Sequence, residues 1–160
     1  MDRLDHRVQL LLDKMALHEL ITRLARGVDR CDRELIVSCY HPDAYDDHGA
    51  YKGGPEGFAD WVIAAVQGNW VQHTCYNELF DVQGDIAYGE IYVSQKMRGP
   101  DGGLIPGYGR YIDKYERRGA EWRIAQRQVI TEYVPTELGL DIAAFVQGSQ
   151  DRDDPSYRRA

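Results

Sequence analysis

Residues 70–134, WVQHTCYNELFDVQGDIAYGEIYVSQKMRGPDGGLIPGYGRYIDKYERRGAEWRIAQRQVITEYV, decide the fold. This stretch holds four segments rich in β-branched and aromatic residues, near 70–82, 86–98, 106–118 and 121–134. Each connection is short and carries turn residues: Gln83-Gly84-Asp85, Pro100-Asp101-Gly102-Gly103 and Arg118-Gly119-Ala120. Short connections of this kind join antiparallel neighbours, so the stretch predicts one sheet of long strands.

The part of the chain before this sheet is predicted to be mainly helical. Apolar residues recur there at three- and four-residue spacing, which indicates a helix from about residue 5 to residue 30 with one buried stripe. A short helix is expected over about 33–39, and a strand or hairpin arm over about 44–51. Pro55 suits the first turn of a further helix that ends near Gln67. The residues of the first stripe are Leu17, Leu20, Ile21, Leu24 and Val28.

The order of these elements predicts the fold class. Helices followed by a run of antiparallel strands indicate an α+β protein whose curved sheet packs against the helices, and they disfavour a parallel nucleotide-binding sheet. A chain of 160 residues has room for one domain. We expect that domain over 1–147, with a short helix near 138–146, and a polar, mobile tail over 148–160.

Composition narrows the classes of partner. The formal charge of −7 repels a phosphate backbone, so nucleic acid is not an expected partner. Three cysteines form no CxxC pair, as expected in a reducing compartment. The first residues are charged where a signal peptide is apolar, and no apolar run approaches ~18 residues. The sequence therefore predicts a soluble cytoplasmic protein without a membrane partner.

Motifs for common cofactors and nucleophiles are absent from the sequence. It contains no phosphate-binding glycine loop, HExxH, paired CxxC or GxSxG, so we expect no cofactor. Asp46, Asp47 and His48 are metal-ligand types, but alternation along a strand places Asp47 on the opposite face from its two neighbours. Two ligands are too few for a closed site, so no metal is predicted.

Among the histidines, only His73 has a context that suits a cavity. His6 and His18 fall on the first helix and His41 precedes a proline, so surface or capping roles are expected for these three. His73 alternates with Val71, Cys75 and Leu79, which predicts an apolar strand face. From these residues alone, a hydrogen-bonded core histidine is the preferred reading of His73, and a helix-end residue with local hydrogen bonds is the preferred reading of Asp29.

A set of short pieces occurs in a fixed order along the chain. They are Gly27-Val28-Asp29-Arg30, His41-Pro42-Asp43-Ala44, Tyr51-Lys52-Gly53, His73, Tyr115-Glu116-Arg117-Arg118 and Glu121-Trp122-Arg123-Ile124. Together with the order of elements, these pieces resemble the SnoaL-like branch of the nuclear transport factor 2-like superfamily over residues ~10–135. The similar enzymes are scytalone dehydratase, hexachlorocyclohexane dehydrochlorinase and bile-acid 7α-dehydratase. The resemblance implies a cone-shaped, closed α+β barrel.

The resemblance also implies a catalytic pair. Asp29 and His73 match an aspartate at the end of the first helix and a histidine on a strand, and Arg127 matches an arginine of the dehydrochlorinase last strand that assists the leaving group. These enzymes carry a lysine or tyrosine one turn before the aspartate, where this chain has Leu24. Assistance to the leaving group must therefore differ here.

The implied activity is a cofactor-independent elimination. His73, oriented by Asp29, would remove a carbon-bound proton from a hydroxylated aromatic or polycyclic molecule, and water or formaldehyde would depart. Asp46 and His48 are candidates to orient a substrate hydroxyl, and an exposed strand pair is the alternative reading of these two residues. A phenol is expected from Tyr45, Tyr51, Tyr92, Tyr108 or Tyr76, without a choice among them.

Two rival functions remain open from the sequence. An isomerase or polyketide cyclase would use the same proton abstraction without loss of a group. A non-catalytic binding protein, or a subunit similar to the β subunit of ring-hydroxylating oxygenases, would share only the fold. The resemblance further implies a homo-oligomer, with a trimer favoured.

Overall fold

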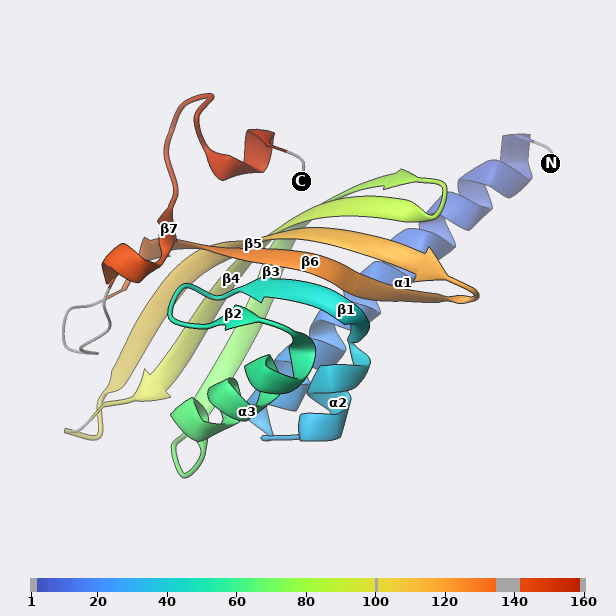
Figure 1. The fold of residues 1–160 in the computed structure, drawn as a ribbon. Helices are drawn as coiled ribbons and strands as arrows, with labels where there is room; N and C mark the ends of the chain where they lie inside the picture. Colours follow the sequence, from blue (N-terminus) through green and yellow to red (C-terminus); the bar gives the residue numbers. More distant parts are fainter. Residues whose placement is uncertain (1–2, 100, 135–141, 159–160) are drawn as a thin grey trace.

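The computed structural model describes residues 3–99, 101–134 and 142–158. Three α-helices precede the long strands, as the sequence predicts, and one short strand pair lies between them (Figure 1). The helices are α1 (Arg3–Asp29), α2 (Arg33–Ser38) and α3 (Pro55–Val66). The strands are β1 (Tyr40–Asp47), β2 (Lys52–Gly53), β3 (Val71–Gln83), β4 (Ile86–Arg98), β5 (Leu104–Arg118), β6 (Glu121–Tyr133) and β7 (Val146–Gln147).

One curved sheet contains all seven of these strands, in the order β2-β1-β6-β5-β4-β3, with β7 also paired to β6. The long hairpins β3–β4, β4–β5 and β5–β6 are antiparallel, whereas β1 and β7 run parallel to β6. The predicted α+β class with a mostly antiparallel sheet is therefore confirmed. The sheet is cone-like but open, because β2 and β3 remain its two edges, so the expectation of a closed barrel is wrong.

The helices cover one face of the sheet, here called the inner face. In Figure 1, α2 and α3 lie below the sheet, α1 crosses behind it, and the C-terminal segment rises above it. The side chain of Asp32 caps α2 by accepting a hydrogen bond from the Leu35 amide, and Pro55 opens α3. The buried stripe of α1 joins inward strand residues in one core, and it is the predicted one: Leu17, Leu20, Ile21, Leu24 and Val28.

β1 begins earlier than the sequence suggests, at Tyr40 rather than near residue 44. This strand fills the edge beside β6, and its start is buried there. His41 is 5% exposed and its Nε2 lies 2.9 Å from the carbonyl oxygen of Glu116. The surface or capping role expected for His41 is therefore wrong. His41 is the second residue of β1, and the parallel pairing of β1 with β6 buries the start of that strand.

A β-bulge changes the phase of β3. The register against β4 shifts between Tyr76 and Glu78, and Asn77 adopts a left-handed φ of 51°. Before the bulge, Val71 and Cys75 share the inner face with His73, but Leu79 lies after it and is 65% exposed. The expectation that Leu79 belongs to the face of His73 is wrong, since one extra residue reverses the alternation.

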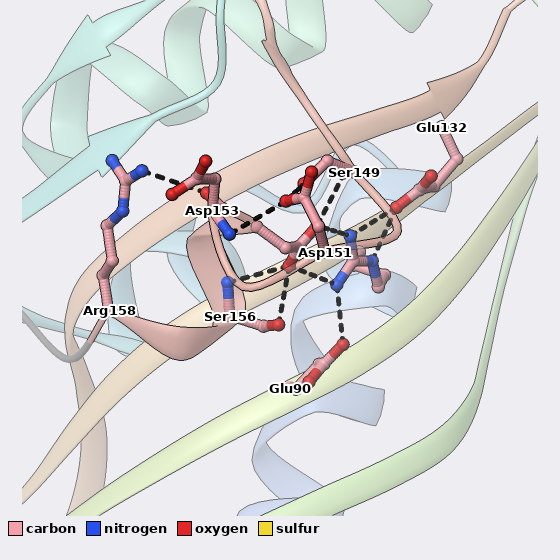
Figure 2. Close-up of polar contacts among 9 residues, drawn as sticks. Glu90, Glu132, Ser149, Asp151, Asp153, Ser156 and Arg158 are labelled. Carbon is pink, nitrogen blue, oxygen red and sulfur yellow. Dashed lines mark hydrogen bonds and ion pairs between the residues drawn. The ribbon is translucent and has the colours of Figure 1, made fainter.

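Residues 148–158 are attached to the other face of the sheet, here called the outer face. Part of the helix expected near 138–146 lies outside the described residues, and the remainder forms a single 3₁₀ turn, Ile142–Ala144. Asp154 is buried, and its carboxylate accepts hydrogen bonds from Arg110 of β5 within a network of acidic and serine residues (Figure 2). The mobility of 148–160 stays a prediction, as does its separation from the domain. No helix in the described ranges is long and apolar enough to cross a membrane.

Candidate active site

A cavity of about 310 Å³ opens on the inner face between α3 and the long strands. This main cavity falls in the size range of small-molecule sites, and its walls are mostly apolar. A smaller inner cavity of about 20 Å³ continues from it, since His48, Val62, His73 and Tyr111 line both. The main cavity is also lined by Trp61, Ala65, Val66, Val93, Gln95, Met97, Gly107, Tyr108, Gly109, Val129, Ile130, Thr131, Val134 and Phe145.

The first polar group at the cavity is the pair of Asp29, the last residue of α1, and His73 of β3. His73 Nδ1 lies 2.6 Å from Asp29 Oδ1, and the His73 amide also donates to both carboxylate oxygens at 3.1 Å. Because a carboxylate only accepts, Nδ1 carries the hydrogen of this bond. His73 Nε2 has no hydrogen-bond partner in the described part of the chain. The pair thus presents one ring nitrogen that is available to a substrate.

A second imidazole–carboxylate pair consists of His48, which lines the same cavity just after the end of β1, and Asp46 of β1 behind it. His48 Nδ1 lies 2.9 Å from Asp46 Oδ1, and the Tyr40 hydroxyl donates to Asp46 Oδ2 at 2.6 Å. The Asp46 side chain is only 1% exposed. Burial alone would raise its pKa, but His48, Arg127 and the Tyr40 hydroxyl outweigh burial and lower the pKa of Asp46 below its ordinary value. Asp46 is therefore a buried carboxylate.

Arg127 of β6 lies behind both pairs. Its Nε and one terminal nitrogen donate to the two oxygens of Asp113 at 2.8 and 2.6 Å, and Tyr115 donates to the same carboxylate. The guanidinium carbon is 3.9 Å from the centre of the Tyr111 ring. Although burial opposes the charge, Asp113 and neighbouring phenols raise the pKa of Arg127 well above its ordinary value. Arg127 lines the inner cavity and keeps its charge.

Of the tyrosines expected near the substrate, some lie at the main cavity and others lie away from it. Tyr108 lines the main cavity, and Tyr51 stacks on the cavity residue Trp61 with a centroid distance of 5.8 Å while its hydroxyl bonds the carbonyl of Gly54. Tyr45 and Tyr92 are 47% and 38% exposed, and neither lines the main cavity. The Tyr76 ring lies at a tilted angle beside that of Tyr92, with a centroid distance of 6.5 Å, and does not line the main cavity. The structure brings Asp29, His73, Asp46, His48, Arg127 and Tyr108 together around the two cavities.

Sequence reasoning missed Tyr111, which lines both cavities. Burial raises the pKa of its phenol well above the ordinary value, so Tyr111 can donate a hydrogen bond but stays protonated. Tyr111, Asp113 and Tyr115 alternate along β5, and this spacing could have indicated that Tyr111 shares a face with other polar groups. Three successive inward positions that carry polar groups are unusual for a core strand.

Other reactive groups and hollows offer less. No cluster of three or more metal-ligand side chains occurs among the described residues. Burial raises the pKa of the Cys75 thiol to about 11, so this cysteine is not a thiolate nucleophile near neutral pH. Larger grooves of about 580 and 690 Å³ lie along β3–β6 and along α1, but their walls are charged or solvent-facing, and the buried polar groups described above converge elsewhere.

Comparison with known families and structures gives one family match. The profile of the SnoaL-like domain matches residues 9–128. No protein with a curated description matches the chain.

Solved structures share the fold at low sequence identity. A hexachlorocyclohexane dehydrochlorinase of type 2 has a TM-score of 0.73 at 21% identity, over 81% of this chain and 91% of that one. A putative scytalone dehydratase from Novosphingobium aromaticivorans has a TM-score of 0.70 at 15% identity, over 78% and 87%. A protein of unknown function from Mycobacterium tuberculosis has a TM-score of 0.72 at 19% identity, over 89% and 83%. At these identities the likeness shows the fold alone.

Proposed function

Because the chain belongs to the SnoaL-like domain family, whose profile spans residues 9–128, we propose that it is a cofactor-independent lyase acting on a hydrophobic small molecule. The single observation that carries this proposal is the 2.6 Å bond between Asp29 and His73 at the wall of an apolar cavity. Structural neighbours with the same fold include a dehydrochlorinase and a putative dehydratase, both of which are named for eliminations.

The proposed first step is removal of a carbon-bound proton by His73 Nε2. The bond from Nδ1–H to Asp29 selects the tautomer whose Nε2 carries a lone pair. The carboxylate then stabilises the imidazolium that forms when the proton is taken. The amide of His73, which donates to the same carboxylate, keeps Asp29 in place during this change.

The departing group and the negative charge on the substrate need further support. Arg127 is proposed to stabilise that charge across the inner cavity, with the protonated phenol of Tyr111 beside it. Because Asp113 already takes two hydrogen bonds from Arg127, the contribution of the arginine is electrostatic rather than direct proton transfer.

The walls of the cavity favour a hydroxylated aromatic or polycyclic substrate. A volume of about 310 Å³ accommodates a small ring system, and Trp61, Tyr108 and Phe145 offer aromatic faces. Water is the expected leaving group, with formaldehyde as the second choice. Incubation with hydroxylated steroids and lignin-like diaryl alcohols, read by product mass, tests the reaction class, because elimination lowers the mass and isomerisation does not.

Product mass also tests two alternative functions. An isomerase or polyketide cyclase would show turnover without loss of mass. A binding protein or oxygenase β-subunit-like protein would show ligand binding without turnover. The homo-oligomer, with a trimer favoured, and the cytoplasmic location also stay predictions, and light scattering measures the first of them.

The decisive variants are His73→Ala and Asp29→Asn. We expect His73→Ala to lower turnover by ~10²–10⁴-fold because the base is lost, and Asp29→Asn to lower it nearly as much by favouring the wrong tautomer. His6→Ala removes an exposed histidine of α1 and is the matched control that should keep full rate. Full activity of His73→Ala, with the fold intact by circular dichroism, would contradict the proposal.

A further inference from the structure

We infer that His48 is the proton donor of this site, so that elimination uses two histidines, His73 as the base and His48 as the acid. The inference rests on the proposed lyase function and adds a catalytic residue to it. It also gives this chain a polar group for the leaving oxygen although Leu24 stands where the similar enzymes carry a lysine or tyrosine. The substrate class it implies is one whose leaving oxygen requires protonation, such as a hydroxyl group.

The position of His48 suits this role. Its ring lines both the main and inner cavities, as does that of His73, so a molecule in the cavity contacts both imidazoles. The His48 ring is held among aromatic rings, with centroids 4.8 Å from Phe58, 5.7 Å from Trp61 and 6.3 Å from Tyr111. Nδ1 faces Asp46, and Nε2 has no protein partner among the residues described.

The charges buried behind His48 do not balance without a further positive charge. The buried groups there are two carboxylates, Asp46 and Asp113, and one guanidinium, Arg127. Asp113 takes both hydrogen bonds of Arg127, so the charge of Asp46 has no other full counter-charge. Burying an unpaired carboxylate is costly. A proton on His48 neutralises Asp46, and the neutral hydroxyl of Tyr40 completes the hydrogen bonds of that carboxylate without adding charge.

The two pairs differ in a way that separates their roles. The Asp29 side chain is 14% exposed and faces a surface hollow that also contains Arg26 and Arg30, so solvent and nearby cations can offset its charge. The proton-accepting role is therefore assigned to His73. Asp46 has no such access, and the groups that face His48 are Asp46, Tyr111 and the aromatic rings, with Arg127 beyond Asp46.

The resulting step is balanced. His73 Nε2 takes a proton from a substrate carbon, the carbon–oxygen bond on the neighbouring carbon breaks, and the electron pair of the carbon–hydrogen bond forms the new double bond. His48 Nε2 gives its proton to the departing oxygen, which leaves as water. After the step His73 carries the extra proton and His48 is neutral, and exchange with solvent restores both.

The protonation states can be read directly by NMR of the full chain labelled with ring-¹⁵N histidine near pH 7. We expect His48 to show two N–H nitrogens and His73 to show one. The variants His48→Gln and His73→Gln assign the signals. Asp46→Asn should convert the His48 signal to a neutral ring, whereas Asp29→Asn should leave it unchanged. A neutral His48 in the wild type would overturn the inference whatever the activity measurements give.

Turnover rates supply a second test, because a purely structural role for His48 would not make the loss of kcat depend on the leaving group. For a hydroxylated compound found to react, His48→Gln should lower kcat by ~10²–10⁴-fold. For its chloro analogue, whose leaving group needs no proton, the loss should be less than ~10-fold. Equal losses for both leaving groups would contradict the donor role while leaving the lyase intact. Full activity of His73→Ala would instead contradict the lyase proposal, whereas the NMR measurement of the His48 protonation state would remain valid.

Discussion

Two arginines are buried on opposite faces of the sheet, and they are held in different ways. Arg127 points inward and binds Asp113, its direct partner in the β5–β6 register, within hairpin strands. Arg110 points outward and binds Glu90 and Glu132 from the adjoining strands, but its most buried partner is Asp154, which lies 44 residues away along the chain. Figure 2 shows the serine and acidic residues around this outer contact.

The two charge clusters differ in the structural elements that they need in order to form. The inner pair forms whenever the sheet forms, because strand register brings its members together. The outer cluster is complete only when the C-terminal segment docks, and Arg110 keeps two carboxylate partners if that segment leaves. We therefore expect the inner pair to contribute to global stability and Asp154 to control mainly the attachment of 148–158.

The largest expected effect is that of Asp113→Asn. It leaves the buried guanidinium of Arg127 without its hydrogen-bonded carboxylate, and loss of one partner of a buried pair costs about 3–5 kcal/mol in the free energy of unfolding. Urea unfolding measures this loss. The control is Asp85→Asn, which breaks the exposed contact of Asp85 with Arg117 and should cost less than about 1 kcal/mol. Similar costs for the two variants would refute the assigned difference.

Asp154→Asn should have a smaller and local effect. Because Glu90 and Glu132 still neutralise Arg110, we expect about 1–2 kcal/mol at most from the lost charged hydrogen bonds. Hydrogen exchange should show loss of protection over 148–158 with little change in β5. Asp153→Asn alters an exposed neighbour and should leave that protection unchanged. If β5 loses protection together with 148–158, the effect of Asp154 is not local, and the assigned difference between the two clusters is wrong.

Acid should release the same segment, with the smallest effect of the three. Hydrogen bonds from Arg110, with those from Ser156 and Ser149, hold the pKa of Asp154 well below its ordinary value. The undocked carboxyl, with a pKa of about 3.9, binds a proton more readily, so docking is fully favoured above that value and weakens as the pH falls below it. Limited proteolysis from about pH 6 to about pH 3 should show this trend in the wild type but not in Asp154→Asn.

The fold was largely predictable because its long hairpins carry local signals. Turn residues and alternating apolar positions place β3 to β6 within a few residues, and apolar spacing places α1. Closure of the sheet was not predictable, since edge strands differ from paired ones only in tertiary contacts. The phase change at Asn77 was also invisible, because a bulge needs no particular residue.

The candidate site divides similarly. Asp29, His73 and Arg127 came from the family resemblance, and the sharing of a face by Asp46 and His48 came from strand alternation. Their convergence on one cavity depends on pairing of β1 with β6, which no local pattern reports. Asp154 was missed for the same reason, because a polar, charged segment gives no sign that one of its carboxylates is buried.

The bulge at Asn77 gives β3 two independent halves. Before it, His73 lines the cavity, whereas after it Glu78 contacts His18 of α1 and Phe80 contacts Tyr115 in the core. A change at Cys75, which lines the surface hollow beside Asp29, therefore leaves the contact between Glu78 and the long helix in place. Deletion of Asn77 would couple the halves again and would exchange the solvent-facing and cavity-facing sides on one of them.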